Sequence, residues 1–289
     1  IGIVDEGVEA NHPDLSANYR SGLSRNFLGD DSNDPSPVSD GETHGNAVAG
    51  VAAARSGNGV GGVGVAPRAG IAALRILDDV DEGMLMNSEV GAVLQHRNDA
   101  IHVYNNSWGF GAGPNQAAGF VNVTRTQTIQ SALRQGVLNG RGGRGSIFVW
   151  AAGNSAEQGD NANYDNMVNS IYTIAVGAVG DKGVHASYSN PGAPIMVVAP
   201  SNGNIAGVTT VDLAGISGRS SGDYRDDFGG TSSAAPVVSG VIALMLEADP
   251  TLNWRDVQHS LVHTAVQVDR EHPEWTTNGA GFSIHPLYG

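Results

Sequence analysis

The chain alternates short, almost continuous apolar runs with segments of helical periodicity, and this alternation strongly constrains the fold. Strands that are buried on both faces of a parallel sheet carry continuous apolar runs, whereas half-buried strands alternate apolar and polar residues. Apolar runs of this kind cover residues 1–5, 71–77, 101–107, 146–154, 171–179 and 194–200. Helical patterns cover residues 44–54, 87–97, 125–140, 233–248 and 253–265. Strands alternating with helices predict an α/β fold with a mostly parallel central sheet and helices on both faces.

The length and composition of the chain indicate one domain with a large core. Of the 289 residues, 40% are hydrophobic, and we find no repeat, linker or low-complexity segment. Single α/β domains of this size are common. We therefore predict one domain over residues 1–289. The longest apolar runs are shorter than a bilayer span, so we expect no membrane-spanning segment.

Charge and cysteine content exclude several classes of function. The formal net charge is −14 at pH 7, which argues against nucleic acid or an anionic membrane as a partner. The acidic runs at residues 29–42 and 221–228 are expected to be solvated loops, with cation or basic-substrate binding as the alternative. The chain has no cysteine, which excludes disulfides, thiol catalysis and cysteine metal sites.

Several polar residues occur where a parallel sheet places functional groups. Asp5 and Asn154 end two of the apolar runs, and sites in open α/β sheets lie beyond the carboxyl ends of the strands. Two serines, Ser232 and Ser233, follow a Gly-Thr pair at the start of a helical pattern. A serine becomes a nucleophile only when a base takes its proton, and His44 is a candidate base. Taken singly, each of these side chains also fits a structural role.

The order Asp, His, Ser along the chain is that of subtilisin. Five segments resemble the signatures of the subtilase family in sequence and in order: IVDEG (3–7), HGNAVAG (44–50), NNSWG (105–109), AAGN (151–154) and GTSSAAP (230–236). Four further segments are similar to the kexin and furin branch: NHPDL, GVGGVGVAP, NSIYTIAVGAV and NWRDVQH. This resemblance covers essentially the whole chain. It implies a three-layer subtilisin-like fold and a serine endopeptidase.

The resemblance also implies a role for each catalytic residue. Ser232, directly after the Gly-Thr pair, matches the nucleophile, and it would begin a helix whose N-terminus favours developing negative charge. His44 would act as the base, and Asp5 would orient it. Asn154 and the Ser232 backbone N–H would bind the oxyanion. The segment Ser107, Trp108, Gly109 resembles the strand that pairs with the substrate backbone.

A calcium site is also implied by the resemblance. The matching ligands are the side chains of Asp14 and Asn58 and the main-chain carbonyls of Arg55, Val60 and Gly62. Such hard oxygen donors suit Ca²⁺ better than zinc. The alternative is a glycine-rich turn without a metal. The glycines of this loop also have GxGxxG spacing, but they lack the strand-turn-helix context of a dinucleotide site. Asp160 matches a ligand of a second calcium ion, although Asn190 replaces the usual glutamate there.

The sequence constrains the substrate specificity less than it constrains the fold or the catalytic residues. Asp165 matches the carboxylate at the floor of the first pocket in kexin-like enzymes, which implies cleavage after Arg or Lys. Glu6 would favour a second basic residue. Ala112 replaces an expected aspartate, so a broad subtilisin-like specificity with an apolar preference remains the alternative.

Other classes of protein fit less well. An α/β-hydrolase esterase requires a GxSxG elbow and the order Ser, Asp, His, and neither is present. A binding module on a degenerate protease fold would be expected to have lost a triad residue. The resemblance further implies polypeptide substrates, a cleaved propeptide and a monomer exported from a bacterium. We also expect a short N-terminal piece before Ile1 and a P domain after the C-terminus.

Overall fold

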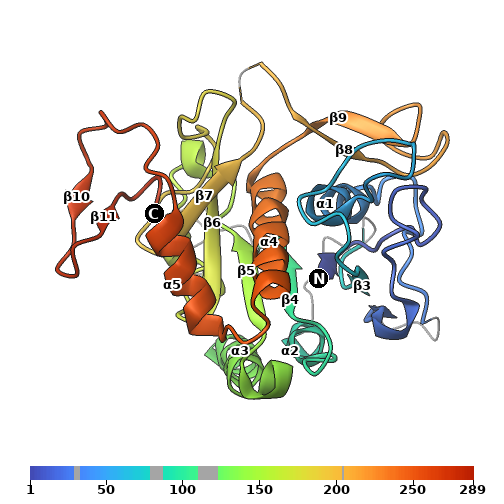
Figure 1. The fold of residues 1–289 in the computed structure, drawn as a ribbon, viewed down its shortest axis with the longest axis horizontal. Coiled ribbons are helices and arrows are strands. Elements are labelled where there is room, and N and C mark those ends of the chain that lie inside the picture. The colour runs from blue at the N-terminus through green and yellow to red at the C-terminus, as the bar shows by residue number, and fades with distance from the viewer. Residues whose placement is uncertain (29–32, 79–86, 110–122, 204) are drawn as a thin grey trace.

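The computed structural model describes residues 1–28, 33–78, 87–109, 123–203 and 205–289. Its centre is a seven-stranded sheet with the order β2-β3-β1-β4-β5-β6-β7, in which all pairs are parallel (Figure 1). The strands are β1 (Gly2–Asp5), β2 (Arg25–Asn26), β3 (Ala72–Arg75), β4 (Val103–Asn106), β5 (Ile147–Ala151), β6 (Thr173–Val179) and β7 (Ile195–Pro200). Six of the seven coincide with the predicted apolar runs. Only β2, with two residues, has no apolar run.

Five α-helices flank the sheet, and each lies on a predicted helical pattern. They are α1 (His44–Ala53), α2 (Asn87–Gln95), α3 (Val123–Gly143), α4 (Thr231–Ala248) and α5 (Trp254–Thr264). In α3, the backbone leaves helical geometry at residues 140–142. Short 3₁₀ helices cover Ser21–Leu23, Ala156–Gln158 and Ala162–Tyr164.

The helices form two layers, one on each face of the sheet. Successive strand residues point to opposite faces. Accordingly, Tyr104 of β4 packs in one apolar cluster with residues of α2 and α3, whereas its neighbour Val103 packs in another with residues of α4 and α5. Helix α1 packs on α4 and on β1. The predicted three-layer α/β fold is confirmed.

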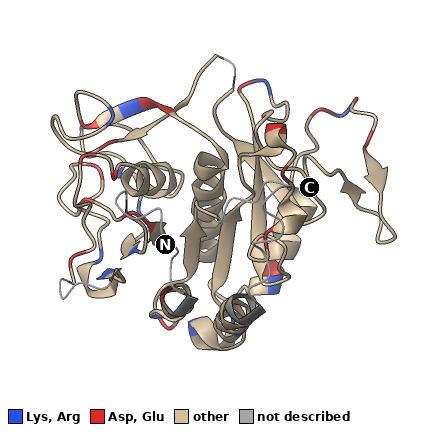
Figure 2. Cartoon of the chain, turned by 180° about the vertical axis from the view of Figure 1, so that it is seen from behind, with Lys and Arg blue, Asp and Glu red and all other residues tan. Residues whose placement is uncertain are grey.

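Helix α4 bears on the expectation that no segment spans a membrane. By length and composition alone, its 18 residues could cross one. The helix packs against β4, β5, β6 and β7, and 61% of it is buried inside the structure, so the expectation stays a prediction. Figure 2 shows charged residues mainly on loops and outer helices, while the strands beneath α4 are free of them.

Both acidic runs also differ from the expected solvated loops. Residues Tyr224–Phe228 form β9, which pairs antiparallel with β8 (Val208–Val211) and leads directly into α4. In the other run, Glu42 is fully buried in an ion pair with Arg75. Glu42 is buried because its partner Arg75 comes from a distant part of the chain, whereas Asp226 and Asp227 of β9 are exposed, as expected.

The C-terminal segment carries the small hairpin β10 (Thr276–Thr277) and β11 (Ser283–Ile284). Beside it, His272, Glu274 and His285 have ligand atoms close enough to hold a metal ion. The Nδ1 atom of His285 accepts the Leu287 N–H, so its Nε2 carries the proton that is donated to His272. The two imidazoles are thus joined by a hydrogen bond of 2.7 Å.

Candidate active site

Asp5 and His44 form the first part of the site. Asp5 is the last residue of β1 and is fully buried, and His44 is the first residue of α1. The Nδ1 atom of His44 lies 2.8 Å from Oδ1 of Asp5. The same oxygen accepts the backbone N–H of Glu6 at 2.9 Å, and the other, Oδ2, is buried and has no hydrogen bond to a described residue. The carboxylate therefore fixes the orientation and tautomer of the imidazole, with Nε2 left free for a proton.

The electrostatic environment of His44 favours its charged form. Burial acts to lower the pKa of His44, but the charge and hydrogen bond of Asp5, followed by the charge of Glu6, outweigh burial and raise the pKa. Arg225 acts in the lowering direction. The edge of the Phe228 ring also packs against the imidazole, with centroids 5.4 Å apart. An imidazolium ion formed during a reaction would thus be stabilised where it arises.

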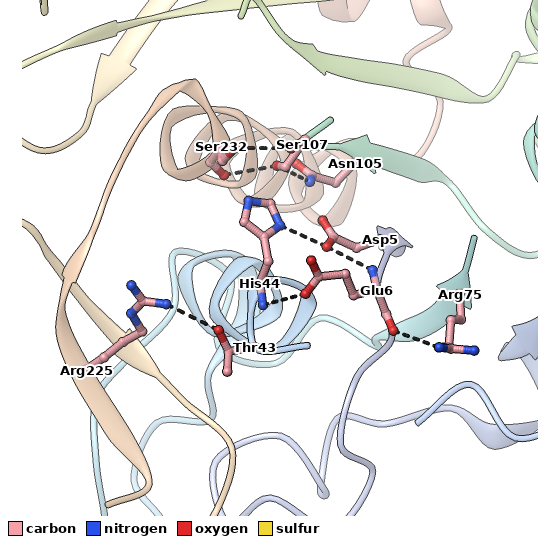
Figure 3. Close-up of polar contacts among 9 residues, drawn as sticks. All are labelled: Asp5, Glu6, Thr43, His44, Arg75, Asn105, Ser107, Arg225 and Ser232. Carbon is pink, nitrogen blue, oxygen red and sulfur yellow. Dashed lines mark hydrogen bonds and ion pairs between the residues drawn. The ribbon is translucent and has the colours of Figure 1, made fainter. Parts of the chain in front are cut away.

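Ser232 approaches His44 from the start of α4. Figure 3 shows the imidazole of His44 between the side chains of Asp5 and Ser232. The hydroxyl of Ser232 donates to the main-chain oxygen of Ser107 at 3.1 Å, and the hydroxyl of Ser107 donates to the main-chain oxygen of Ser232 at 3.0 Å. A rotation of the Ser232 side chain would direct its hydroxyl to His44 instead.

The adjacent serine has a structural environment. Ser233 is fully buried, and its hydroxyl donates to Ser201 at 2.7 Å and to the Gly230 carbonyl at 3.3 Å. Of the two adjacent serines, only Ser232 lines a surface pocket. The geometry therefore separates two serines that are chemically identical in the sequence.

Asn154 follows β5, and its side-chain amide is fixed by two hydrogen bonds to the same oxygen atom, Oδ1. Its Oδ1 accepts the N–H of Thr231 at 2.7 Å and the Thr231 hydroxyl at 2.9 Å. The residue is exposed, and Oδ1 is the atom of its amide that binds Thr231. The amide N–H groups are thereby directed toward the pocket beside Ser232. The sequence did not predict this contact of Thr231 with Asn154, although Thr231 lies within the segment GTSSAAP (230–236).

A pocket of about 210 Å³ lies beside Ser232 and contains most of the predicted substrate residues. Its lining is Ser107, Trp108, Gly109, Ala151, Ala152, Gly153, Asn154, Ser155, Asp160, Asp165, Asn190, Thr231 and Ser232. Trp108 is fixed by Trp150, whose Nε1–H donates to the Trp108 carbonyl at 2.7 Å. Glu6, by contrast, does not line this pocket and contacts the start of α1.

Asp165 places a carboxylate in this pocket. Its Oδ1 accepts the N–H groups of Met167 at 2.7 Å and Val168 at 3.2 Å. Its Oδ2 faces Gly109, at 3.3 Å from the position of an added Cβ. Burial, and to a smaller extent the charge of Asp160, raise the pKa of Asp165 against the opposing effect of these two hydrogen bonds.

Asp160, the predicted ligand of a second calcium ion, is buried beside Asn190 in the lining of the pocket. One carboxylate oxygen accepts the N–H of Asn161, and the other accepts Nδ2 of Asn190, both at 2.8 Å. The amide oxygen of Asn190 accepts the Ser155 N–H at 2.9 Å. An uncharged amide thus occupies the space between Asp160 and the Asn154 loop.

The five residues expected to hold the first calcium ion lie apart from this pocket, where Asp14 meets the loop of residues 55–62. Asp14 is fully buried; its Oδ1 accepts Nδ2 of Asn58, and its Oδ2 accepts the Gly62 N–H at 3.0 Å. A side chain at Gly61 would collide with Asp14 Oδ2 and with the buried hydroxyl of Tyr224. Arg55 donates its backbone N–H to the Asp14 carbonyl, and Val60 is exposed. Ala112 and the rest of 110–122 lie outside the described residues.

Comparisons with known proteins identify relatives over the whole chain. Mouse proprotein convertase subtilisin/kexin type 7 is 39% identical over 294 residues, which are 99% of this chain and 36% of that protein. Human furin is 36% identical over 295 residues, which are 100% of this chain and 35% of furin. The chain therefore spans little more than a third of the length of these relatives.

Solved structures show the same fold. The serine protease of Aeromonas sobria superposes with a TM-score of 0.87 at 27% identity, over 100% of this chain and 57% of that one. A cold-adapted subtilisin-like proteinase superposes with a TM-score of 0.66 at 23% identity, over 99% of this chain and 87% of that one. Residues 1–289 match the profile of the subtilase family from end to end, and the chain therefore belongs to the subtilase family of serine peptidases.

Proposed function

We propose that this domain hydrolyses internal peptide bonds by means of an Asp5–His44–Ser232 triad. The observation that carries the proposal is the position of the His44 imidazole, which is bonded to Asp5 through Nδ1 and lies between Asp5 and Ser232 (Figure 3). Peptide hydrolysis by a serine nucleophile requires a base that takes the serine proton and a carboxylate that orients this base. Furin and the other convertase relatives share the family and support an endopeptidase.

In the proposed mechanism, the Ser232 side chain first turns from the Ser107 carbonyl toward Nε2 of His44. His44 takes the hydroxyl proton as Oγ attacks the scissile carbonyl carbon, and Asp5 stabilises the resulting imidazolium. The oxyanion accepts hydrogen bonds from Asn154 Nδ2 and from the Ser232 N–H. His44 then gives the proton to the leaving amine, and an acyl-enzyme remains on Ser232. Water, activated by His44, releases the acid product and restores the serine.

A fluorophosphonate probe tests the triad directly, because it reacts only with an activated serine. We expect stoichiometric labelling of the wild type, none in Ser232→Ala and strongly reduced labelling in His44→Ala. Ser233→Ala is the matched control, since its hydroxyl is buried away from His44. Labelling that survives Ser232→Ala but disappears in Ser233→Ala would overturn the assignment.

We propose that cleavage follows Arg, or Lys, through Asp165. The support is the position of Asp165 Oδ2, which faces Gly109 in the pocket beside Ser232, together with the similarity to convertases. A half-buried carboxylate such as that of Asp165 gains from a cationic partner that replaces lost hydration. The alternative is an apolar preference, which the walls formed by Trp108 and Ala152 would favour.

We further propose that the Asp14 loop binds Ca²⁺. Asp14 is a buried carboxylate that accepts hydrogen bonds from the Asn58 amide and the Gly62 N–H, both of which are uncharged donors. A half-turn of the Asn58 amide would bring a second oxygen beside the first. With main-chain carbonyls of Arg55, Val60 and Gly62, this donor set fits Ca²⁺. Because Gly61 has no side chain, the backbone of this loop lies directly against the carboxylate of Asp14.

A second calcium ion at Asp160 stays a prediction, and we do not propose it here, because Asn190 supplies a neutral amide beside Asp160. Both oxygens of this carboxylate accept hydrogen bonds, and the Asn190 amide bridges it to Ser155. The proposed mechanism therefore includes no metal ion at this position.

The wider setting of the domain is also a proposal. The Aeromonas sobria protease has been solved in a complex with a chaperone. By analogy, we propose that this chain is exported from a bacterium and matures with the help of a folding partner, such as its own propeptide.

A further inference from the structure

Glu6 directs its carboxylate at the first residue of α1. Its Oε2 accepts the backbone N–H of His44 at 3.0 Å (Figure 3). The first four N–H groups of a helix have no partner within the helix and are usually satisfied by a capping side chain. In α1, the N-cap residue Thr43 makes no side-chain cap bond, and the first turn contains no acidic residue. The acceptor is therefore supplied from the end of β1, 38 positions away.

The main chain of Glu6 is equally constrained. Its N–H donates to Oδ1 of Asp5, the same atom that binds His44. Its carbonyl accepts Nε of Arg75 at 3.0 Å, and Arg75 forms a 2.8 Å ion pair with Glu42 in which both side chains are almost fully buried. Glu6 thus contacts both Asp5 and His44, and Arg75 of β3 holds its main chain in place.

A second, independent feature shows how closely these segments pack. A Cβ added to Gly45, the residue after His44, would collide with the carbonyl oxygen of Gly7, the residue after Glu6. The backbone that follows Asp5 therefore lies directly against the start of α1. In this tight junction, the direction of the Glu6 side chain is set by the packing.

We propose that Glu6 is a positioning residue for the catalytic histidine: it caps α1 from the end of β1 and so holds the His44 backbone in register with Asp5. The inference rests on the proposed triad. It differs from the expectation that Glu6 selects a basic residue in the substrate, because the carboxylate is bonded to the helix that carries the base. Negative charge at a helix N-terminus also interacts favourably with the helix dipole.

The charged groups that face His44 are Asp5, Glu6 and Arg225. Glu42 lies nearby but is paired with Arg75. Asp5 and Glu6 raise the pKa of His44, whereas Arg225 lowers it. Removal of the Glu6 charge alone should therefore lower the pKa of His44 and leave the other contributions in place.

Three variants separate these effects. Glu6→Gln keeps an oxygen that can accept the His44 N–H but loses the charge, whereas Glu6→Ala loses both. Glu271→Gln, at an exposed position in the C-terminal segment, is the control for a neutral substitution. Each variant is assayed with two peptides that carry Arg before the scissile bond and differ only in having Arg or Ala one position earlier. The imidazole of His44 is titrated in parallel by NMR, with His44→Gln for assignment.

For a positioning residue, Glu6→Ala lowers kcat about fivefold, the loss typical of a missing helix cap, and does so equally for both peptides. Glu6→Gln keeps most of kcat and shifts the His44 titration to lower pH. A loss confined to KM for the Arg-Arg peptide, or an unchanged His44 titration in Glu6→Gln, would overturn the proposal. The NMR titration does not require catalysis. A wild type that fails to react with fluorophosphonate would thus refute the triad, while the role of Glu6 would still be decided.

Discussion

Ser232 and Ser107 exchange hydrogen bonds, each hydroxyl donating to the main-chain oxygen of the other residue at 3.1 Å and 3.0 Å. The pair joins the end of β4 to the start of α4. It therefore places the candidate nucleophile beside the segment that is expected to pair with the substrate backbone. It also gives the Ser232 hydroxyl a resting partner, which it must leave before it reacts.

Ser107→Ala should destabilise the fold. The Ser107 hydroxyl also accepts a hydrogen bond from Nδ2 of the fully buried Asn105 at 2.9 Å, so its loss leaves this buried amide without that partner. An unsatisfied buried group costs about 1–3 kcal/mol, and we expect the free energy of unfolding to fall by that amount. Urea unfolding measures it, with the exposed Ser16→Ala as a control. Equal stability of the two variants would show that water replaces these bonds.

Asn154→Ala should reduce kcat by about 10²–10³, the effect that loss of one oxyanion donor has in subtilisin, with little change in KM. Thr231→Val keeps the backbone N–H that binds Asn154 Oδ1 but removes the hydroxyl, so it should have a much smaller effect. Steady-state kinetics on one Arg peptide compares the two. A larger loss in Thr231→Val than in Asn154→Ala would contradict the assigned oxyanion donor.

Asp165→Asn should abolish the preference for Arg. Loss of a desolvated charge partner costs about 2–5 kcal/mol, so kcat/KM for an Arg peptide should fall at least about 30-fold, while a Leu peptide is cleaved as before. Asp40→Asn, at an exposed carboxylate, controls for the change in net charge. Unaltered discrimination in Asp165→Asn would favour the apolar reading of the pocket.

The raised pKa of Asp165 predicts two pH effects with defined signs. As pH falls through this pKa, the carboxylate becomes neutral, and KM for the Arg peptide should rise more than KM for the Leu peptide. A group whose pKa is raised by folding stabilises the protein only at low pH, and this contribution is lost as pH rises through the folded-state pKa. Asp165→Asn should therefore melt higher than the wild type at pH 7, and the difference should shrink in acid. A lower melting temperature of the variant at pH 7 would contradict this.

Calcium should stabilise the wild type through Asp14. Ligand binding to the folded state adds about 2.7 kcal/mol at 100 times Kd. We expect the melting temperature to rise with Ca²⁺ but not with equal Mg²⁺, and Asp14→Asn to lose the response while Asp160→Asn keeps it. The melting temperatures of the wild type, Asp14→Asn and Asp160→Asn are measured by thermal unfolding after chelation and again after each ion is added. A response that disappears in Asp160→Asn and persists in Asp14→Asn would place the ion at the other carboxylate.

Six of the seven strands of the central sheet could be predicted from the sequence. Continuous apolar runs suit strands covered on both faces, and parallel strands bring their carboxyl ends to one edge, where Asp5 ends β1 and Asn154 follows β5. The tertiary structure alone decided what each polar side chain contacts. Ser233 is bonded to Ser201, the Asn190 amide joins Asp160, and Glu6 caps α1, with partners 32, 30 and 38 positions apart. β9 and the buried Glu42 were likewise read as solvated. Local composition reports how polar a residue is, whereas its hydrogen-bond and charge partners are set by segments that meet only in the folded chain.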